Sequence, residues 1–230
     1  MDFDFSEDQE QLRDAVRKWV DKGYDFERRR AIVNAGGFDR GVYTELAELG
    51  LTGLYVSEDH GGMGMGPVEA MIAMEELGRG IVLEPLAQTL IASAVLQTHA
   101  PADLQSGWLP RIAGGEAIVV LAHQERGARH HLDRCKTEAK EAGGQWTVSG
   151  TKSVVPVGDV ADAFIVPALA SGQMALFLVE RAAAQRRAAP AVRRRRPGPR
   201  GHRRRRRPPG HRRPWRTAGP HRPAARPRPR

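Results

Sequence analysis

The chain has 230 residues, a net charge of +9 and a single cysteine, and its charge is unevenly distributed. Residues 181–230 hold 20 arginines and no acid, which leaves 16 basic and 27 acidic side chains, a net charge of −11, for residues 1–180. One cysteine excludes an intramolecular disulfide and favours a reducing, cytoplasmic location, while the absence of a long apolar run or a basic, apolar leader argues against a membrane span and a secretory signal.

The N-terminal segment carries a helix-start signal. Ser6 and Gln9 have the spacing of a capping box, and Gly23 offers a stop. Between them, apolar residues recur at helical spacing at Leu12, Val16, Trp19 and Val20. A second helix is predicted over about residues 39–49.

Residues 51–80 combine an apolar run, a glycine-rich loop and a helix. The glycines do not follow the G-x-G-x-x-G pattern of a dinucleotide site, so a flexible connector is the preferred interpretation. Pro67 suits the first helical position. The adjacent Glu75 and Glu76 are expected to be surface charges, and the expected core residues are Val68, Met71, Ile72, Met74 and Leu77. Further helices at about 84–98 and 102–113 complete a helical domain at residues 1–115.

The hydrophobic period then changes from helical to extended. Short, β-branched stretches separated by Gly, Pro or Asp predict strands at residues 117–123, 145–150, 152–157, 163–168 and 174–179. Gly143 and Gly144 lie where a hairpin can reverse. The predicted fold class is therefore α+β, with an N-terminal all-helical domain and a partial antiparallel β domain at residues 116–181. Such a partial sheet leaves an unpaired edge.

The last segment, residues 182–230, differs in composition from everything before it. Arg, Pro, Ala and Gly make up 43 of the last 50 residues, so the segment cannot bury an apolar core and is expected to be a disordered basic tail. One interpretation is an out-of-frame read through a GC-rich gene, because these four residue types are encoded by G and C alone. The alternative is a genuine arm that binds nucleic acid through phosphate contacts.

Residue patterns alone do not reveal a catalytic centre. The sequence contains no nucleophile elbow and no phosphate-binding P-loop. Polar loop histidines are preferred over a metal site for the cluster of His123, His130, His131, Asp133 and Cys135, because its spacing is not that of a closed zinc site.

The order of four segments is more specific. Residues 45–67 (ELAELGLTGLYVSEDHGGMGMGP), 73–80 (AMEELGRG), 109–129 (LPRIAGGEAIVVLAHQERGAR) and 146–166 (WTVSGTKSVVPVGDVADAFIV) together resemble the acyl-CoA dehydrogenase family, nearest to chains described as small subunits of pimeloyl-CoA dehydrogenases. The resemblance implies an N-terminal helical domain, a middle β domain, a C-terminal helical bundle and FAD. The implied reaction is α,β-desaturation of an acyl-CoA thioester.

The resemblance also implies where FAD would lie. The family's flavin-side strand and the turn after it correspond to residues 121–131, and a second flavin-side stretch corresponds to residues 150–156. Val154 stands where the family has a tryptophan, and Pro156 stands where it has a threonine that can donate a hydrogen bond. Glu125, in the first stretch, is open to a structural interpretation as an anchor of its turn. The cofactor-binding residues carried over in this way are Leu121, His123, Gln124, Arg129, His130, Val154 and Pro156.

No glutamate in residues 1–180 matches the family's catalytic base. The expectation is therefore an inactive fragment that holds FAD poorly, with no catalytic residue assigned. Acyl-CoA is the implied substrate, and a homo-oligomer or a hetero-oligomer with a larger homologous subunit is the implied assembly. The alternative function, from a different class, is nonspecific binding of nucleic acid or another polyanion by the arginine-rich tail.

Overall fold

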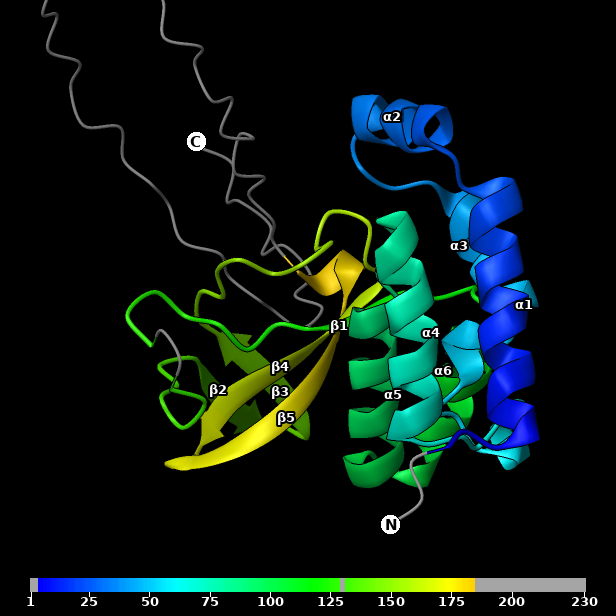
Figure 1. Ribbon diagram of the computed structural model, residues 1–230. Helices are drawn as coiled ribbons and strands as arrows, with labels where there is room; N and C mark the ends of the chain where they lie inside the picture. Colours follow the sequence, from blue (N-terminus) through cyan, green and yellow to red (C-terminus); the bar gives the residue numbers. More distant parts are fainter. Residues whose placement is uncertain (1–3, 129–130, 185–230) are drawn as a thin grey trace, which may run out of the picture.

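The computed structural model describes residues 4–128 and 131–184, in which six α-helices lie beside a five-stranded sheet (Figure 1). This arrangement confirms the α+β class. The helices are α1 (Glu7–Gly23), α2 (Phe26–Ala35), α3 (Arg40–Glu48), α4 (Pro67–Gly80), α5 (Leu86–His99) and α6 (Ala102–Ala113). The strands are β1 (Val119–Leu121), β2 (Glu138–Ala142), β3 (Gln145–Ser149), β4 (Ala163–Ala170) and β5 (Gln173–Glu180).

Helix α1 begins with the predicted capping box. The Ser6 hydroxyl accepts a hydrogen bond from the Gln9 amide at 3.2 Å, and the Gln9 side chain accepts one from the Ser6 amide at 3.0 Å. Val16 and Val20 are buried on the inner side of the helix, in a core that α4 and the start of α5 share. Two orphan amides are thus satisfied locally, and apolar burial then fixes the helix against its neighbours.

Helix α2 was not predicted from the sequence. The Asp25 side chain caps it by accepting a hydrogen bond from the Arg28 amide at 2.7 Å. The helix buries only Ile32, whereas Phe26 and Val33 are largely exposed. Figure 1 shows α2 projecting beyond the ends of α1 and α3. Helix α2 therefore lacks a continuous apolar stripe, and the spacing of apolar residues in the sequence does not predict it.

Helix α4 starts at Pro67 as predicted, but part of its expected core was wrong. Ile72 and Leu77 are buried, and the exposed fractions of the other three residues are 44% for Val68, 52% for Met71 and 37% for Met74. The helix packs on α1 through a different stripe, which includes Ala70 and Ala73. The expectation of a surface charge at Glu76 was also wrong, because that residue is 2% exposed.

Strand β4 organises the sheet. Its first residues pair with β1 and its last residues with β2, both in parallel, while its other edge pairs with β5 in antiparallel register. Strands β2 and β3 form an antiparallel hairpin closed by Gly143 and Gly144, whose φ values are 60° and 74°. The predicted hairpin and antiparallel pairings are therefore present, and the two parallel pairings of β4 make the sheet mixed.

Two strand predictions differ from the structure. Residues 152–157 form a loop that leads into a turn instead of a strand, with φ values of 52° at Val154 and 45° at Val157. This left-handed backbone interrupts an extended conformation, and it is rare for β-branched residues. Strand β2, in contrast, was not predicted, because its sequence EAKEA has only alanines as apolar residues.

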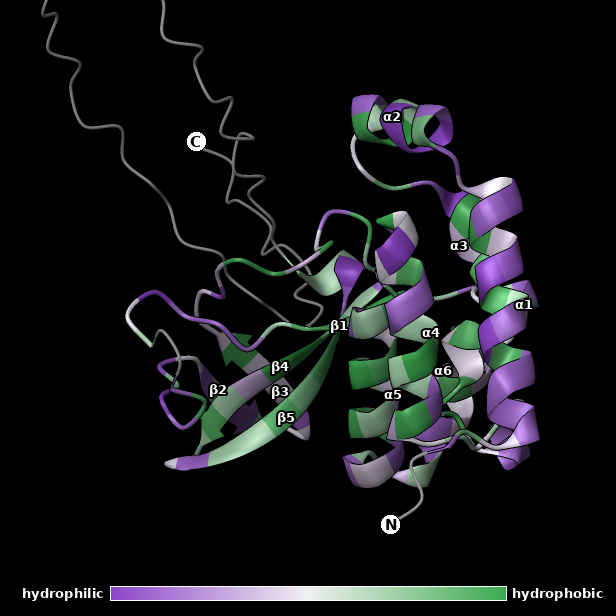
Figure 2. Cartoon of the chain, in the orientation of Figure 1, coloured by the Kyte–Doolittle hydropathy of each residue, from purple (hydrophilic) through white to green (hydrophobic). Residues whose placement is uncertain are grey.

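The sheet buries both faces over much of its area. On one face, Val119 and Ile165 pack against Trp108 and Ile112 of α6. On the other face, Phe164 and Val166 lie in a separate core with residues of β2, β3 and β5. Figure 2 shows hydrophobic residues along β4 and β5 and on α5, while the visible surface of α1 is mostly hydrophilic. The first of these two cores joins α5 and α6 to the sheet.

The described chain ends just beyond β5. Arg181–Ala183 form a 3-10 turn, and the Arg181 guanidinium donates hydrogen bonds to the carbonyls of Ala161 at 2.5 Å and Asp159 at 2.9 Å. The expected disordered tail begins at residue 182, and from residue 185 onward it lies outside the described residues. Within residues 4–128 and 131–184, no helix has the length and apolar character needed to cross a membrane.

Candidate functional site

The structure brings together the two stretches that carry the predicted cofactor residues. The chain leaves β1 and runs beside residues 150–157, and the Ser153 amide donates a hydrogen bond to the Gln124 carbonyl at 2.8 Å. The Ala122 amide holds the same segment to β4 by donating to the Ile165 carbonyl at 2.9 Å. Residues separated by about thirty positions in the sequence are thus neighbours at one end of the sheet.

The side chains at this place differ in exposure. His123, Val154 and Pro156 are exposed, and the exposed fraction of Val154 is 81%. Gln124 is partly buried, and Leu121 packs against the core between α6 and the sheet. Arg129 and His130, the remaining predicted cofactor residues, lie outside the described residues. The described cofactor candidates therefore present two apolar side chains, Val154 and Pro156, and one ionisable side chain, His123, to the surface.

Behind this surface lies a buried polar cluster, defined by Glu125, Cys135, Thr137 and Lys152. Glu125 Oε1 accepts hydrogen bonds from Lys152 Nζ at 2.8 Å and from the Thr137 hydroxyl at 2.6 Å. The backbone amides of Lys136 and Thr137 donate to the same carboxylate at 2.7 and 3.0 Å. Both members of the ion pair are buried, with side-chain exposures of 7% for Lys152 and 6% for Glu125.

These contacts determine the charge state of Glu125. Burial by itself raises the pKa of the carboxyl, but the hydrogen bonds from Lys152, Thr137 and the two amides outweigh it and lower the pKa to about 2. A carboxylate with such a low pKa and so many donors is a weak proton acceptor. Glu125 therefore anchors three chain segments to one another, in agreement with the structural interpretation of its turn.

The sequence alone did not identify Lys152 or Thr137 as partners of Glu125. Both residues have polar neighbours on either side in the sequence, so nothing there marks them as buried, and their proximity to Glu125 depends on how the segments after β1 and β3 fold back. Cys135, treated in the sequence as a candidate metal ligand, lies in this cluster with its sulfur 3.6 Å from Lys152 Nζ. Among the described residues, no three His, Cys, Asp or Glu side chains gather as a metal site.

A small cavity of about 30 Å³ adjoins the cluster. Lys152 and Thr137 line it on the polar side, and Phe164 and Val166 of β4 line it on the apolar side. A cavity needs about 10–15 Å³ of such space to hold one water molecule, so this one has room for no more than a few. It is therefore a packing space in the sheet and is too small for a nucleotide.

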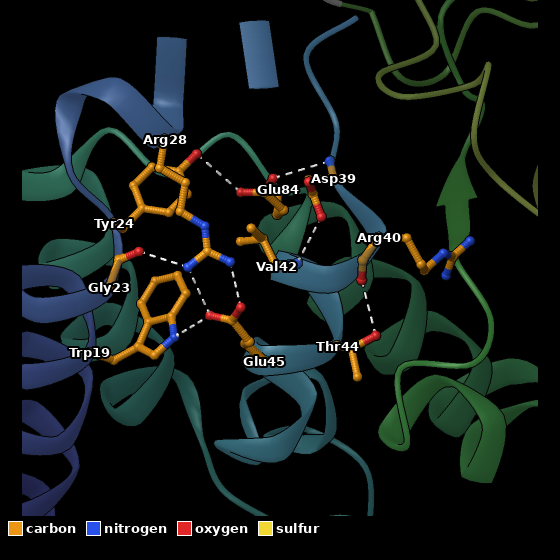
Figure 3. A network of polar contacts seen from close by, with 10 residues as sticks. All are labelled: Trp19, Gly23, Tyr24, Arg28, Asp39, Arg40, Val42, Thr44, Glu45 and Glu84. Atoms are coloured by element: carbon orange, nitrogen blue, oxygen red, sulfur yellow. Dashed lines mark hydrogen bonds and ion pairs between the residues drawn. The ribbon is translucent and has the colours of Figure 1, made fainter. Parts of the chain in front are cut away.

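A second polar network, shown in Figure 3, joins the helices and not the sheet. Arg28 of α2 forms an ion pair with Glu45 of α3, and Trp19 Nε1 of α1 donates to the same carboxylate at 2.9 Å. Nearby, the buried Glu84 accepts hydrogen bonds from the Tyr24 hydroxyl at 3.2 Å and from the Asp39 amide at 3.3 Å. This network positions α2, which has little apolar contact of its own.

The comparisons with known proteins agree with this architecture. Residues 6–116 match the family described as acyl-CoA dehydrogenase, N-terminal domain. Benzylmalonyl-CoA dehydrogenase of Aromatoleum aromaticum is 30% identical over 186 residues, which are 79% of this chain and 49% of that protein. The ChsE4-ChsE5 complex from Mycobacterium tuberculosis has a chain that is 28% identical, with a TM-score of 0.71 over 78% of this chain and 49% of that one.

A third relative shows the fold alone. The glutaryl-CoA dehydrogenase from Mycobacterium smegmatis, solved in complex with FADH2, is 22% identical, with a TM-score of 0.67 over 76% of this chain and 46% of that one. The chain thus spans about half the length of the relatives it matches. The helical domain, the mixed sheet and the matches in sequence and structure lead to one conclusion: the chain belongs to the acyl-CoA dehydrogenase family.

Proposed function

We propose that this chain contributes the helical domain and the flavin-side wall of a FAD-dependent acyl-CoA dehydrogenase that acts in the cytoplasm. The observation that carries the proposal is the hydrogen bond from the Ser153 amide to the Gln124 carbonyl, because it joins the two stretches that the family resemblance assigns to the flavin. The proposal includes a division into residues 1–115, 116–181 and 182–230. The single cysteine supports the cytoplasmic location.

The described residues fit one side of a flavin. The exposed Val154 can contact an apolar ring face, and His123 and Gln124 carry groups that can hydrogen-bond to its polar edge. Pro156 has no amide hydrogen to donate. When bound, FAD would accept the hydride that leaves the acyl chain. One wall with few donors supports weak binding by this chain alone.

A binding measurement tests this assignment. FAD is titrated into the full chain while the fluorescence anisotropy of the flavin is followed. Val154→Asp should weaken the binding, because it places a charge against an apolar ring. Val33→Asp is the matched control, since Val33 is also an exposed valine and lies on α2. Equal affinity of both variants and of the wild type would contradict the assignment of residues 150–156 to the flavin.

The same chain is proposed to be inactive as a dehydrogenase by itself. Desaturation of a thioester requires a carboxylate that removes the α-proton, and Glu125 is unsuited because its oxygens already accept hydrogen bonds from Lys152, Thr137 and two amides. The test is reduction of an artificial electron acceptor with FAD and a panel of acyl-CoA thioesters. Turnover at rates typical of enzymes would refute the inactivity and leave the FAD assignment standing.

Assembly with a larger homologous subunit is the proposed route to a complete site. The relatives supply the support, since one of them was solved as the complex of ChsE4 with ChsE5. Co-purification of the full chain with a homologous chain, followed by light scattering, measures the composition of the assembly. A chain that stays monomeric beside its homologue speaks against this part of the proposal.

The alternative function is polyanion binding through residues 187–230. The observation that favours it is the concentration of 20 arginines in the last 50 residues, against a net charge of −11 in residues 1–180. Binding of this kind should show little base preference and should weaken steeply with salt. Duplex DNA of mixed sequence, titrated at low and high salt, tests it. Negligible affinity at low salt would exclude the alternative.

A further inference from the structure

The Cys135 thiol and the Lys152 amine lie together in the buried polar cluster of Glu125, Cys135, Thr137 and Lys152. Cys135 Sγ is 3.6 Å from Lys152 Nζ, and both groups contact Glu125 Oε1, the sulfur at 3.4 Å and the nitrogen at 2.8 Å. Near-attack geometries bring reacting atoms to about 3–3.5 Å. The sulfur and the nitrogen are therefore almost at reacting distance in the folded protein.

The two groups are also held in place. Lys152 is buried and paired with Glu125, which in turn is fixed by the Thr137 hydroxyl and amide. The sulfur lies 3.3 Å from the Pro167 carbonyl of β4. The amine therefore has little freedom to move away from the thiol, which keeps the entropic cost of bringing them together low.

Cys135 is partly exposed, whereas Lys152 is not. A small oxidant can consequently reach the sulfur, and the product would form beside a buried amine. Cys135 is the single cysteine of the chain, so no second thiol of the same molecule can compete by forming a disulfide.

We propose that Cys135 and Lys152 form an oxidation-dependent covalent cross-link, a sulfenamide, when the protein meets hydrogen peroxide. In the first step the thiol sulfur takes one oxygen atom from the peroxide, the O–O bond breaks, and sulfenic acid and water are formed. Sulfur is oxidised by two electrons and the peroxide is reduced by two.

In the second step the Lys152 nitrogen attacks the sulfur. The ammonium first loses one proton to solvent; the S–N bond then forms as the S–O bond breaks, and the hydroxyl leaves with a second nitrogen proton as water. The sum is one thiol, one ammonium and one peroxide giving one sulfenamide, two waters and one proton.

The cross-link would fasten the segment before β2 to the segment after β3. The latter segment carries Val154 and Pro156, so the oxidation state of Cys135 would control how firmly this surface is held. The inference stands on the geometry of the cluster and does not depend on the flavin assignment.

The test uses the full chain, with a stoichiometric excess of hydrogen peroxide and intact mass spectrometry. The expected product is lighter than the reduced chain by two hydrogen atoms, and a thiol reductant should restore the original mass. Tryptic mapping should find the Cys135 peptide joined to a peptide in which cleavage after Lys152 is blocked.

The control variant is Lys152→Arg, which keeps a cation beside Glu125 but removes the amine. It should accumulate sulfenic acid at Cys135 that a sulfenic-acid trap such as dimedone labels, whereas the wild type should label weakly. Equal trapping in both proteins, or a wild-type chain that gains oxygen with Lys152 still cleavable, would overturn the proposal. An intermolecular disulfide as the main product would overturn it as well.

Discussion

Arg17 on α1 and Glu76 on α4 form an ion pair at 2.6 Å in which the Glu76 side chain is 3% exposed and the Arg17 side chain is 46% exposed. Arg79 completes the arrangement by donating to the other carboxylate oxygen at 2.9 Å and by pairing with Asp21 at 2.8 Å. The buried carboxylate of Glu76 thus lies between α1 and α4 and contacts two partly exposed arginines, Arg17 and Arg79. This pairing offsets the desolvation of a single buried carboxylate.

Replacing this carboxylate should destabilise the protein. Glu76→Gln removes the charge that both arginines contact, and we expect a loss of about 1–3 kcal/mol in the free energy of unfolding. Urea denaturation followed by circular dichroism measures it. The matched control is Glu75→Gln on the exposed side of the same helix, where we expect a change within about 0.5 kcal/mol. Equal effects at both positions would contradict the role of the pair.

The same carboxylate predicts a pH dependence. The hydrogen bond from Arg17 lowers the pKa of Glu76 below its usual value in spite of burial, and Arg79 adds to the effect. A lowered pKa in the folded state stabilises the protein above the unfolded pKa, and this contribution is lost as the pH falls through the folded pKa. Acid titration of stability should therefore be less steep in Glu76→Gln than in the wild type.

Glu84 should change the stability of the protein with pH in the opposite direction. Burial raises the pKa of this carboxyl, and hydrogen bonds from the Asp39 amide and the Tyr24 hydroxyl only partly offset it (Figure 3). A raised pKa means that the contribution of Glu84 is present at low pH and is lost as the pH rises through the folded value. Glu84→Gln should flatten the stability profile above the usual glutamate pKa. If the stability of Glu84→Gln fell more steeply with pH in this range than that of the wild type, the raised pKa of Glu84 would be contradicted.

Disrupting the buried ion pair of Glu125 and Lys152 should destabilise the protein more than disrupting an exposed ion pair. Glu125→Gln leaves the Lys152 ammonium buried without its counter-charge, and we expect a loss of about 3–5 kcal/mol in unfolding free energy. Because the pKa of Glu125 is lowered to about 2, the wild-type contribution should disappear only as the pH falls toward that value. Glu138→Gln, at an exposed residue of β2, is the control. Thermal unfolding of the three proteins provides the measurement.

Two glycines predict opposite responses to alanine. A Cβ at Gly62 would lie 2.1 Å from the Val56 carbonyl oxygen, so Gly62→Ala must shift the backbone and should cost at least about 1–3 kcal/mol. A Cβ at Gly107 of α6 would meet no atom within 4 Å, so Gly107→Ala should stabilise the helix by about 0.5–1 kcal/mol. Melting temperatures of the two variants should move in opposite directions. Similar shifts would contradict the close approach in the glycine-rich loop.

Features that depend on neighbouring residues were predictable from the sequence. The capping box of Ser6 and Gln9, the start of α4 at Pro67 and the hairpin at Gly143 and Gly144 all match the structure. Each of them involves residues within one helical turn or one hairpin, whose conformation is set by local hydrogen bonds and allowed backbone angles. The resemblance to the acyl-CoA dehydrogenase family likewise rests on short sequence segments that occur in the same order, all within residues 45–166.

Features that depend on distant partners were not predictable. Glu76 is buried because Arg17, 59 residues earlier in the chain, covers it, and Val68 and Met71 are exposed because α4 turns another stripe toward α1. Residues 152–157 have strand-like composition, yet they form a loop with left-handed backbone at Val154.

The sequence by itself therefore determined the change from a helical domain to a β domain, the capping box of α1, the start of α4, the Gly143–Gly144 hairpin and the membership in a family, because these follow from short-range chemistry. Only the tertiary structure decided which face of each helix is buried, that β4 pairs in parallel with β1 and β2, and that Glu125, Cys135 and Lys152 meet. The physical reason is that burial and ion pairing depend on the positions of segments far apart in the chain, which no local pattern records.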